Sequence, residues 1–167
     1  MHVAVGSDHA GFELKQLLSE HLARLGHQVI DLGTHSTEPV DYPDFGAAVG
    51  ARVATGGADL GLCVCGTGIG ISIAANKVYG VRAAVVHDAS SARLAREHND
   101  ANVICFGARL VGAEVAIDSL ETFLHSEFKK GRHQRRIEEI TALETSFKHT
   151  LGEPTMKALE GVSNDNP

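Results

Sequence analysis

The sequence predicts an α/β protein, with a Rossmann-like or flavodoxin-like five-stranded parallel sheet, helices on both faces and an added C-terminal helix. Three observations predict this class. Five short apolar runs rich in β-branched residues alternate with longer segments of helical period. Three of the 18 glycines lie in one turn, Gly66–Gly70, which directly follows such a run. A length of 167 residues accommodates this alternation in one domain.

The predicted strands are the five apolar runs. They are Val3–Val5, Gln28–Leu32, Leu60–Cys65, Val81–Val86 and Val103–Phe106. In the flavodoxin-like strand order 2-1-3-4-5, the connections reverse direction between the first and third strands. Ligands of open parallel sheets bind at the carboxyl ends of the strands at such a point. We therefore expect a ligand site where the first and third strands end.

The predicted helices fill the segments between and after the strands. Apolar residues recur at spacings of three and four between the first two strands, at Leu14, Leu17, Leu18, Leu22 and Leu25. Further helical patterns cover Phe45–Ala54, a short segment through Ile73 to Asn76, Ser90–Glu97 and Val111–Leu124. After Gly131, a long amphipathic helix is predicted from Ile137, Ile140, Leu143, Phe147 and Leu151. Its apolar stripe fits either its own sheet or a second subunit.

Composition bounds the domain organisation and the partners. Hydrophobic residues make up 43% and charged residues 22%, as in ordinary globular domains. The net charge of −6 argues against nonspecific nucleic-acid binding, which needs a basic field. No apolar stretch approaches the roughly 18 residues that span a bilayer, and no signal-peptide pattern is present. We expect one cytoplasmic domain over residues 1–151, a loosely held polar tail over 152–167, and neither nucleic-acid nor membrane binding.

Two loops carry most of the candidate chemistry. The first predicted strand ends at Asp8 and His9, and the third ends at Cys65, directly before the glycine-rich turn. Backbone amides of such a turn can approach an anion, although a tight turn that needs small residues explains the glycines equally. The spacing matches neither a dinucleotide fingerprint nor a P-loop.

The three cysteines divide into one candidate reactive group and two packing residues. Cys65 lies at a strand end facing a helix N-terminus, where the thiolate form is favoured. Cys63 and Cys105 lie within apolar strands and are expected to be core residues. An odd count with a Cys-x-Cys spacing fits no disulfide framework, and this spacing is narrower than that of usual zinc ligand pairs. A metal site on this pair is the weaker alternative for Cys63 and Cys65.

Two further groups of residues are candidates for binding or catalysis. His98 follows the fourth predicted helix, where a helix C-terminal cation is the alternative interpretation. Arg132 and Arg136 are four apart and therefore share one helix face, which suits a phosphate or carboxylate. A solvated basic turn is the alternative for this pair.

Together, six motifs resemble type B ribose-5-phosphate isomerase, in the family's order, from about residue 2 to about residue 142. The motifs are Gly6-Ser7-Asp8-His9-Ala10-Gly11-Phe12, Asp41-Tyr42-Pro43, Cys65-Gly66-Thr67-Gly68-Ile69-Gly70, Ala74-Ala75-Asn76-Lys77, His98-Asn99-Asp100-Ala101-Asn102 and Gly131-Arg132-His133-Gln134-Arg135-Arg136. The same superfamily includes galactose-6-phosphate isomerase subunits. The segment past about residue 145 is longer than is usual in this family.

The resemblance implies an aldose–ketose isomerase that works through a cis-enediolate without metal or organic cofactor. It makes Cys65 the base, with Thr67 and the amides of Gly66, Gly68, Ile69 and Gly70 stabilising the enediolate. It makes His98 the acid that opens the sugar ring, with Asp8 at the same end of the sugar. Residues implied to contact the substrate or its phosphate are His9, Tyr42, Asn99, Arg109, Arg132 and Arg136. Some relatives have another residue at the position of Cys65 and take their base from a carboxylate in the loop that follows. This loop carries Ile69 and Ile71 and neither Asp nor Glu here, which implies the cysteine-type branch of the family.

The resemblance also implies the assembly: a homodimer or tetramer whose active site is shared, with His98 and Arg109 coming from the neighbouring subunit. Ribose 5-phosphate is the expected substrate, and a tetrulose 4-phosphate or a hexose 6-phosphate such as galactose 6-phosphate is the alternative. Two other classes stay open: a noncatalytic subunit of a two-subunit isomerase, and a flavin- or nucleotide-binding module.

Overall fold

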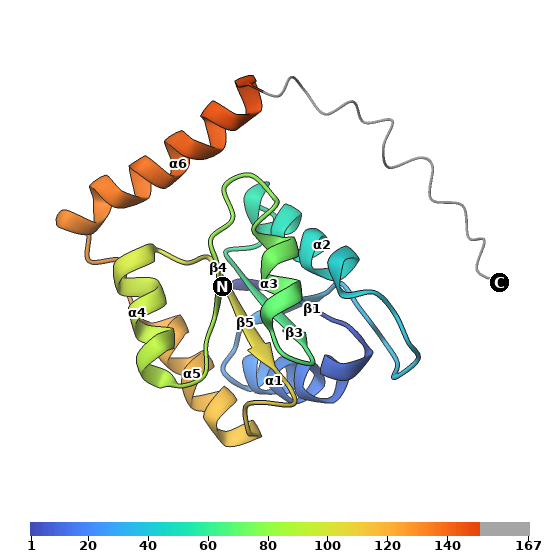
Figure 1. The fold of residues 1–167 in the computed structure, drawn as a ribbon. Coiled ribbons are helices and arrows are strands. Elements are labelled where there is room, and N and C mark those ends of the chain that lie inside the picture. Colours follow the sequence, from blue (N-terminus) through green and yellow to red (C-terminus); the bar gives the residue numbers. More distant parts are fainter. Residues whose placement is uncertain (151–167) are drawn as a thin grey trace.

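The predicted fold class is confirmed by the computed structural model, which describes residues 1–150, with the backbone alone for 147–150. Five parallel strands form one sheet in the order β2-β1-β3-β5-β4 (Figure 1). The strands are β1 (His2–Ser7), β2 (Gln28–Asp31), β3 (Leu60–Cys65), β4 (Ala83–Val85) and β5 (Val103–Gly107). The helices are α1 (Phe12–Arg24), α2 (Tyr42–Ala54), α3 (Ile69–Ala75), α4 (Ala89–Asn99), α5 (Ala113–His125) and α6 (Arg132–Thr150).

The expected strand order 2-1-3-4-5 is wrong for the last two strands. β5 lies between β3 and β4, and β4 is the edge strand. The physical reason is burial: all five residues of β5 are buried, whereas β4 is a short run of half-buried residues. An uninterrupted buried run is favoured in the interior of a sheet covered on both faces. The reversal between β1 and β3, on which the predicted site depends, is unaffected.

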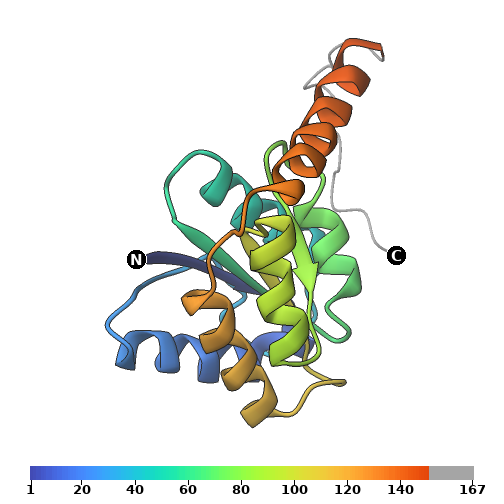
Figure 2. The same ribbon diagram turned by 90° about the vertical axis from the view of Figure 1, so that its left-hand side faces the viewer.

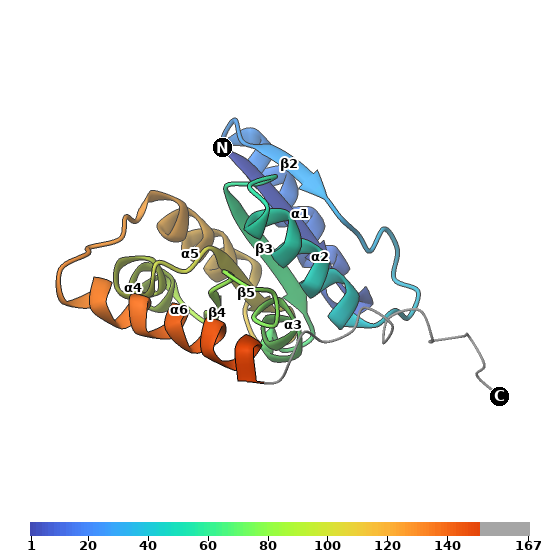
Figure 3. The same cartoon turned by 90° about the horizontal axis from the view of Figure 1, so that it is seen from above.

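Two apolar cores lie on the two faces of the sheet. On one face, α1, α4 and α5 bury residues such as Leu18, Leu22, Ala95, Leu120 and Phe123 against the strands. On the other face, α2 and α3 pack side by side over a core that contains all three cysteines (Figure 3). This three-layer arrangement brings the loops that follow β1, β3 and β5 to one edge of the sheet.

Helix α6 is set apart from these layers and projects beyond the body of the molecule (Figure 2). Of its predicted apolar stripe, Ile137 is buried, whereas Ile140 is 42% and Leu143 57% exposed. The side chain of Phe147, residue Leu151 and the predicted tail 152–167 lie outside the described residues. Within residues 1–150, no helix is both long and apolar enough to cross a membrane.

Candidate active site

The loops after β1, β3 and β5 meet at the carboxyl edge of the sheet, as predicted for the first two. Ser7 is in register with Val64, and Cys65 is in register with Gly107. Asp8 continues the pairing, because its main-chain N–H donates to the carbonyl of Val64 at 3.2 Å. We call the residues gathered here the carboxyl-edge cluster; they are Asp8, His9, Tyr42, Cys65 to Gly70 and Arg109.

Cys65 ends β3 and is 4% exposed. Its Sγ accepts a hydrogen bond from the Gly68 N–H at 3.1 Å, which folds the loop back over the thiol. Gly68 has φ +78, and a β-carbon at this position would lie 2.9 Å from the carbonyl carbon of Phe106. Only glycine fits both the backbone conformation and this close approach. The loop geometry that orients Cys65 therefore depends on a glycine at position 68.

Cys63 and Cys105 are core residues, as predicted. Both are fully buried with no exposed surface, and they face one another across the register of β3 and β5. Burial, and then the neighbouring Cys63, raise the pKa of the Cys105 thiol well above its usual value. All three cysteines are free thiols. Of the three, Cys65 is the one at the end of its strand, next to the loop.

Asp8 and His9 are each held by hydrogen bonds to backbone atoms. Asp8 is 7% exposed, and its Oδ1 accepts from the Gly11 N–H at 2.9 Å, which caps the short 3₁₀ helix His9–Gly11. Nδ1 of His9 lies 3.2 Å from both the nitrogen and the oxygen of Val40. The second ring nitrogen of His9 has no protein partner in the described part of the chain, and it is available to a ligand.

Tyr42, Thr67 and Ile69 border the loop on its solvent side. Tyr42 is the first residue of α2, and a β-carbon on Gly70 would lie 2.6 Å from the tyrosine ring, so the ring rests on the loop. Thr67 is exposed, and its Oγ1 accepts from the Ile69 N–H at 3.3 Å. Ile69 is itself 53% exposed.

The expectation that Arg109 comes from a neighbouring subunit is wrong for this geometry. Arg109 follows β5 by two residues, and its N–H donates to the carbonyl of Gly66 at 3.1 Å. A β-carbon on Gly66 would lie 3.6 Å from the guanidinium carbon of Arg109. Because β5 is the sheet neighbour of β3, Arg109 belongs to the same edge, and the same chain, as Cys65.

A lysine that the predictions omit anchors the loop after β2. Lys15 is fully buried, and its Nζ donates to both carboxylate oxygens of Asp31, at 2.6 and 2.7 Å, and to the Thr34 carbonyl at 2.8 Å. The loop after β2 is also attached to the end of β1, because the Thr34 N–H donates to the Ser7 carbonyl at 2.9 Å. A charged residue in the leucine stripe of α1 was the available sequence signal.

The other predicted residues lie at the opposite edge of the sheet. We call them the amino-edge cluster: His98, Asn99, Arg132 and Arg136, where α4 ends and α6 begins. The ring of His98 stacks on His133, with centroids 4.2 Å apart. Lys129 joins the two helices, because its Nζ contacts Glu97 Oε2 at 2.8 Å. His133 is absent from the predicted site residues, although it lies between the two arginines in the sequence.

The side chains of the amino-edge cluster are open to a ligand. Asn99, Arg132 and Arg136 are exposed, and neither arginine forms an ion pair with the described part of the chain. Burial lowers the pKa of His133, and the positive charges of His98, Arg132, Arg136 and Lys129 lower it further. Arg132 and Arg136 therefore present positive charge that no carboxylate of the described residues pairs with.

The two clusters do not meet within one chain. The residues of the carboxyl-edge cluster follow the ends of the strands, whereas the end of α4 precedes the start of β5. In Figure 1, the β5 arrow points away from the end of the sheet at which α6 lies. The five residues of β5 alone separate the edges by about 16 Å. The predicted base Cys65 and the predicted acid His98 therefore cannot act on one substrate within a single chain.

Neither cluster has the composition of a metal centre. Within residues 1–150, no group of three or more His, Cys, Asp or Glu side chains converges closely enough to hold a metal ion. The thiol, imidazole, guanidinium and backbone amide groups at these edges instead suit proton transfer and anion binding.

Comparison with known proteins identifies the family. A family model described as Ribose/Galactose Isomerase matches residues 3–140. The chain is 49% identical over 142 residues to ribose-5-phosphate isomerase B of Escherichia coli (strain K12), covering 85% of this chain and 95% of that protein. It is 43% identical over 137 residues to the galactose-6-phosphate isomerase subunit LacB of Clostridium acetobutylicum, covering 82% of this chain and 79% of that protein.

Solved structures agree. Ribose-5-phosphate isomerase B of Clostridium thermocellum superposes with a TM-score of 0.87 at 49% identity, covering 88% of this chain and 99% of that one. The Mycoplasma genitalium enzyme with bound ribulose-5-phosphate has a TM-score of 0.83 at 43% identity, covering 86% and 96%. The matches confirm the resemblance carried by the six motifs. The chain therefore belongs to the ribose/galactose isomerase family and is a sugar-phosphate aldose–ketose isomerase.

Proposed function

We propose that the protein interconverts ribose 5-phosphate and ribulose 5-phosphate through a cis-enediolate. The observation that carries this proposal is the enclosure of Cys65 at the carboxyl edge, with its sulfur held by the Gly68 amide beside Arg109 and Tyr42. The similar proteins named ribose-5-phosphate isomerase B, one of them solved with ribulose-5-phosphate bound, support the five-carbon substrate.

The reaction moves one proton between neighbouring carbons and leaves the sugar's overall oxidation state unchanged. The Cys65 thiolate takes the proton from C2 of the open-chain aldose, and the electron pair of that bond forms the C1–C2 double bond of an enediolate. Return of the proton to C1, with transfer of the hydroxyl proton from O2 to O1, gives the ketose. Thr67 and the amides of the Gly66–Gly70 loop stabilise the negative charge that develops on O1 and O2.

A second copy of the chain completes the site. In this arrangement Asp8, His9 and Arg109 come from one chain, and His98, Asn99, Arg132 and Arg136 come from its partner. Apolar side chains left uncovered support such an assembly, as a dimer or a tetramer: Ile69, Ile73, Tyr79, Ile140 and Leu143 are all more than 40% exposed. The four groups that hold the phosphate are then His9 and Arg109 of one chain and the two arginines of the other.

The remaining roles follow from the same arrangement. His98 of the partner donates the proton that opens the furanose ring, and Asp8 binds the same end of the sugar. The free thiols support action in the reducing cytoplasm. Neither a metal nor an organic cofactor takes part in any of these steps.

A panel of substrates tests the proposal. We expect the purified chain to show its highest kcat/KM with ribose 5-phosphate, compared with four-carbon and six-carbon sugar phosphates. A higher kcat/KM with galactose 6-phosphate is the outcome favoured by the similarity to LacB, and it contradicts the five-carbon assignment while keeping the chemistry. No turnover by the chain alone, with turnover restored by a second homologous protein, instead identifies a noncatalytic subunit.

A further inference from the structure

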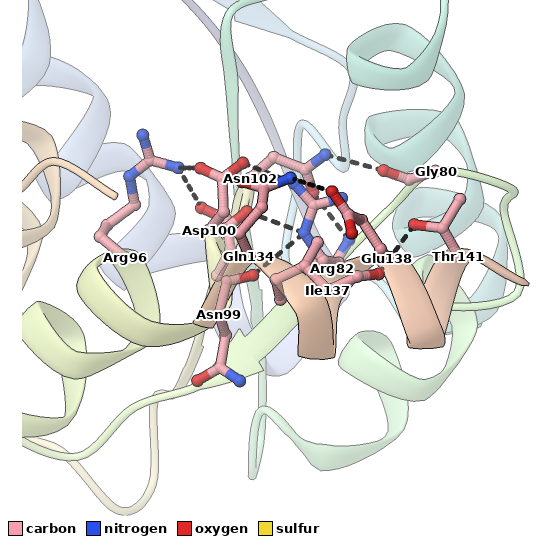
Figure 4. Close-up of polar contacts among 11 residues, drawn as sticks. Gly80, Arg82, Arg96, Asn99, Asp100, Asn102, Gln134, Ile137, Glu138 and Thr141 are labelled. Carbon is pink, nitrogen blue, oxygen red and sulfur yellow. Dashed lines mark hydrogen bonds and ion pairs between the residues drawn. The ribbon is translucent and has the colours of Figure 1, made fainter. Parts of the chain in front are cut away.

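We propose that Arg82 is a positioning residue for His98 and Asn99: it locks the end of α4 so that these two side chains point toward the substrate. This inference rests on the proposed roles of His98 and Asn99. Arg82 lies in the segment just before β4, at the amino edge of the sheet, and it takes no part in the proposed reaction. Its contacts are drawn in Figure 4.

The guanidinium of Arg82 binds the turn that follows His98 and Asn99. Its Nε donates to the carbonyl oxygens of Asn99 and Asp100, both at 3.0 Å. Its Nη2 donates to the Asp100 carboxylate at 3.0 Å. Because Nε binds the carbonyl of Asn99 itself, a shift of Arg82 is transmitted directly to the residue that contacts the substrate.

A second arginine closes the turn from the other side. Arg96 donates to the other carboxylate oxygen of Asp100 at 3.0 Å and to the Ala101 carbonyl at 2.7 Å. Asp100 has φ 44 and ψ 43, the left-handed conformation that ends α4, and a non-glycine residue adopts it at a cost in backbone energy. Two guanidiniums on one carboxylate therefore hold a conformation that the backbone alone does not favour.

Arg82 is itself fixed to the sheet. Its main-chain N–H donates to Asn102 Oδ1 at 2.8 Å, and Asn102 Nδ2 donates to the Gly80 carbonyl at 2.9 Å. The carbonyl of Arg82 accepts from the Asn102 N–H at 3.1 Å. The backbone of Arg82 is thus attached to the residue just before β5, and its guanidinium connects the end of α4 to this fixed point.

His98 is then held at both its ring and its backbone. Its ring stacks on His133 of α6, whereas its backbone precedes the turn held by Arg82. An acid that opens a sugar ring must lie within hydrogen-bond distance of the ring oxygen, so a small displacement lowers the rate steeply. A loss of Arg82 should therefore reduce ring opening more than the proton transfer that Cys65 carries out.

Two reactions of the same enzyme separate these steps. Isomerisation of ribose 5-phosphate requires ring opening, because the aldose is a furanose. Exchange of the C1 hydrogen of ribulose 5-phosphate with deuterium oxide requires only the base, because O5 is esterified and the ketose stays open. The ratio of the isomerisation rate to the exchange rate is therefore a measure of His98 function that a general loss of folded protein does not change.

The variant to measure is R82A, beside R93A as a matched control. Arg93 is also paired with a carboxylate, Glu97 on the same helix, but it is 45% exposed and away from the turn. We expect R82A to lower the ratio about tenfold, and R93A to leave it unchanged. R82K, which keeps the charge but cannot bind two carbonyls and the carboxylate together, should lie between them.

Chemical rescue provides the second readout and protects the test against a folding defect. Arg82 and Asn99 both line a cavity of about 360 Å³ beneath α6, through which a small cation can reach the vacated position. We expect guanidinium chloride at millimolar concentration to raise the ratio of R82A toward its normal value, and sodium chloride at equal ionic strength to leave it low.

The possible failures are distinguishable. H98Q is the reference, because it removes the acid directly and should lower the same ratio. A normal ratio in R82A with a lowered ratio in H98Q overturns the inference alone. A normal ratio in H98Q contradicts the proposed role of His98, and the inference falls with it. A lowered ratio in R82A that guanidinium does not restore assigns the loss to packing and also overturns the positioning role.

Discussion

The imidazole rings of His98 and His133 stack with their centroids 4.2 Å apart and their planes 9° from parallel. This contact joins the last turn of α4 to the first turn of α6, the two helices that carry the amino-edge cluster. Because the His133 ring is buried and Arg132, Arg136 and Lys129 add positive charge around it, a proton on this ring is unfavourable. Protonation of His133 at low pH should therefore destabilise the folded protein.

The pH dependence of the unfolding free energy tests whether the pKa of His133 is lowered in the folded protein. Burial lowers the pKa of His133 below its usual value of 6.5, so the folded state binds this proton less well than the unfolded chain. The neutral ring contributes its full stability above the unfolded pKa, and this stability is lost as the pH falls below it. We expect H133Q to lose less unfolding free energy than the unsubstituted protein between about pH 7.5 and about pH 5.5.

Urea unfolding at several pH values measures this effect. Gln134, the next residue of α6, is exposed and carries no titratable group, so Q134A provides the control and should leave the pH dependence unchanged. An acid-induced loss in H133Q equal to that of the unsubstituted protein would show that the His133 ring is not desolvated in solution.

Removal of the thiol at position 65 tests the base. We expect C65A to lower kcat by about a thousandfold or more, because no other proton acceptor lies at the end of β3. Binding of a five-carbon phosphorylated sugar acid, measured by calorimetry, should change little. C63A is the control: it empties space in the core and lowers stability by about 1–2 kcal/mol, with activity retained at a permissive temperature. Substantial activity in C65A would sink the assignment.

Complementation tests the sharing of the site between copies. C65A and H98A are each expected to be inactive toward ribose 5-phosphate. In a mixed dimer, one of the two sites joins an intact carboxyl-edge cluster to an intact amino-edge cluster. Co-expression should therefore restore about one quarter of the normal activity, since half of the dimers are mixed and each has one complete site. Mixtures as inactive as the single variants would place both residues in one chain's site.

Substitution at Gly68 tests the loop geometry. Alanine at this position combines a φ of +78 with a contact of 2.9 Å to the Phe106 carbonyl carbon, so G68A should lower the unfolding free energy by about 2 kcal/mol or more. Activity should fall with it, because the hydrogen bond to Cys65 comes from the same residue. Gly112 has φ −70 and no atom within 4 Å of a β-carbon, so G112A is the control expected to be nearly neutral. Equal stability of the two variants would contradict the close approach.

Much of the fold and of the carboxyl-edge cluster was predictable from the sequence. The apolar runs and the helical periodicity indicate which side of each segment is buried. The structure has a strand or a helix at each of these segments. The glycines after Cys65 indicate a turn whose backbone conformation is also a local property of the chain. The convergence of the loops after the first and third strands follows from the rule for open parallel sheets. These features depend on neighbours in the chain, so periodicity and turn chemistry reveal them.

The rest depends on contacts between distant elements, which periodicity does not report. The exchange of β4 and β5 is decided by which run is buried on both faces, and it places Arg109 directly beside the loop that follows Cys65 of the same chain. Side-chain contacts join α4 to α6, through the stack of His98 on His133, and to the segment before β4, through the binding of Asp100 by Arg82. The sequence by itself determined the elements, the glycine-rich loop and the reactive residue types. Only the tertiary structure decided the order of the last two strands and which side chains touch, because both depend on how separate elements pack.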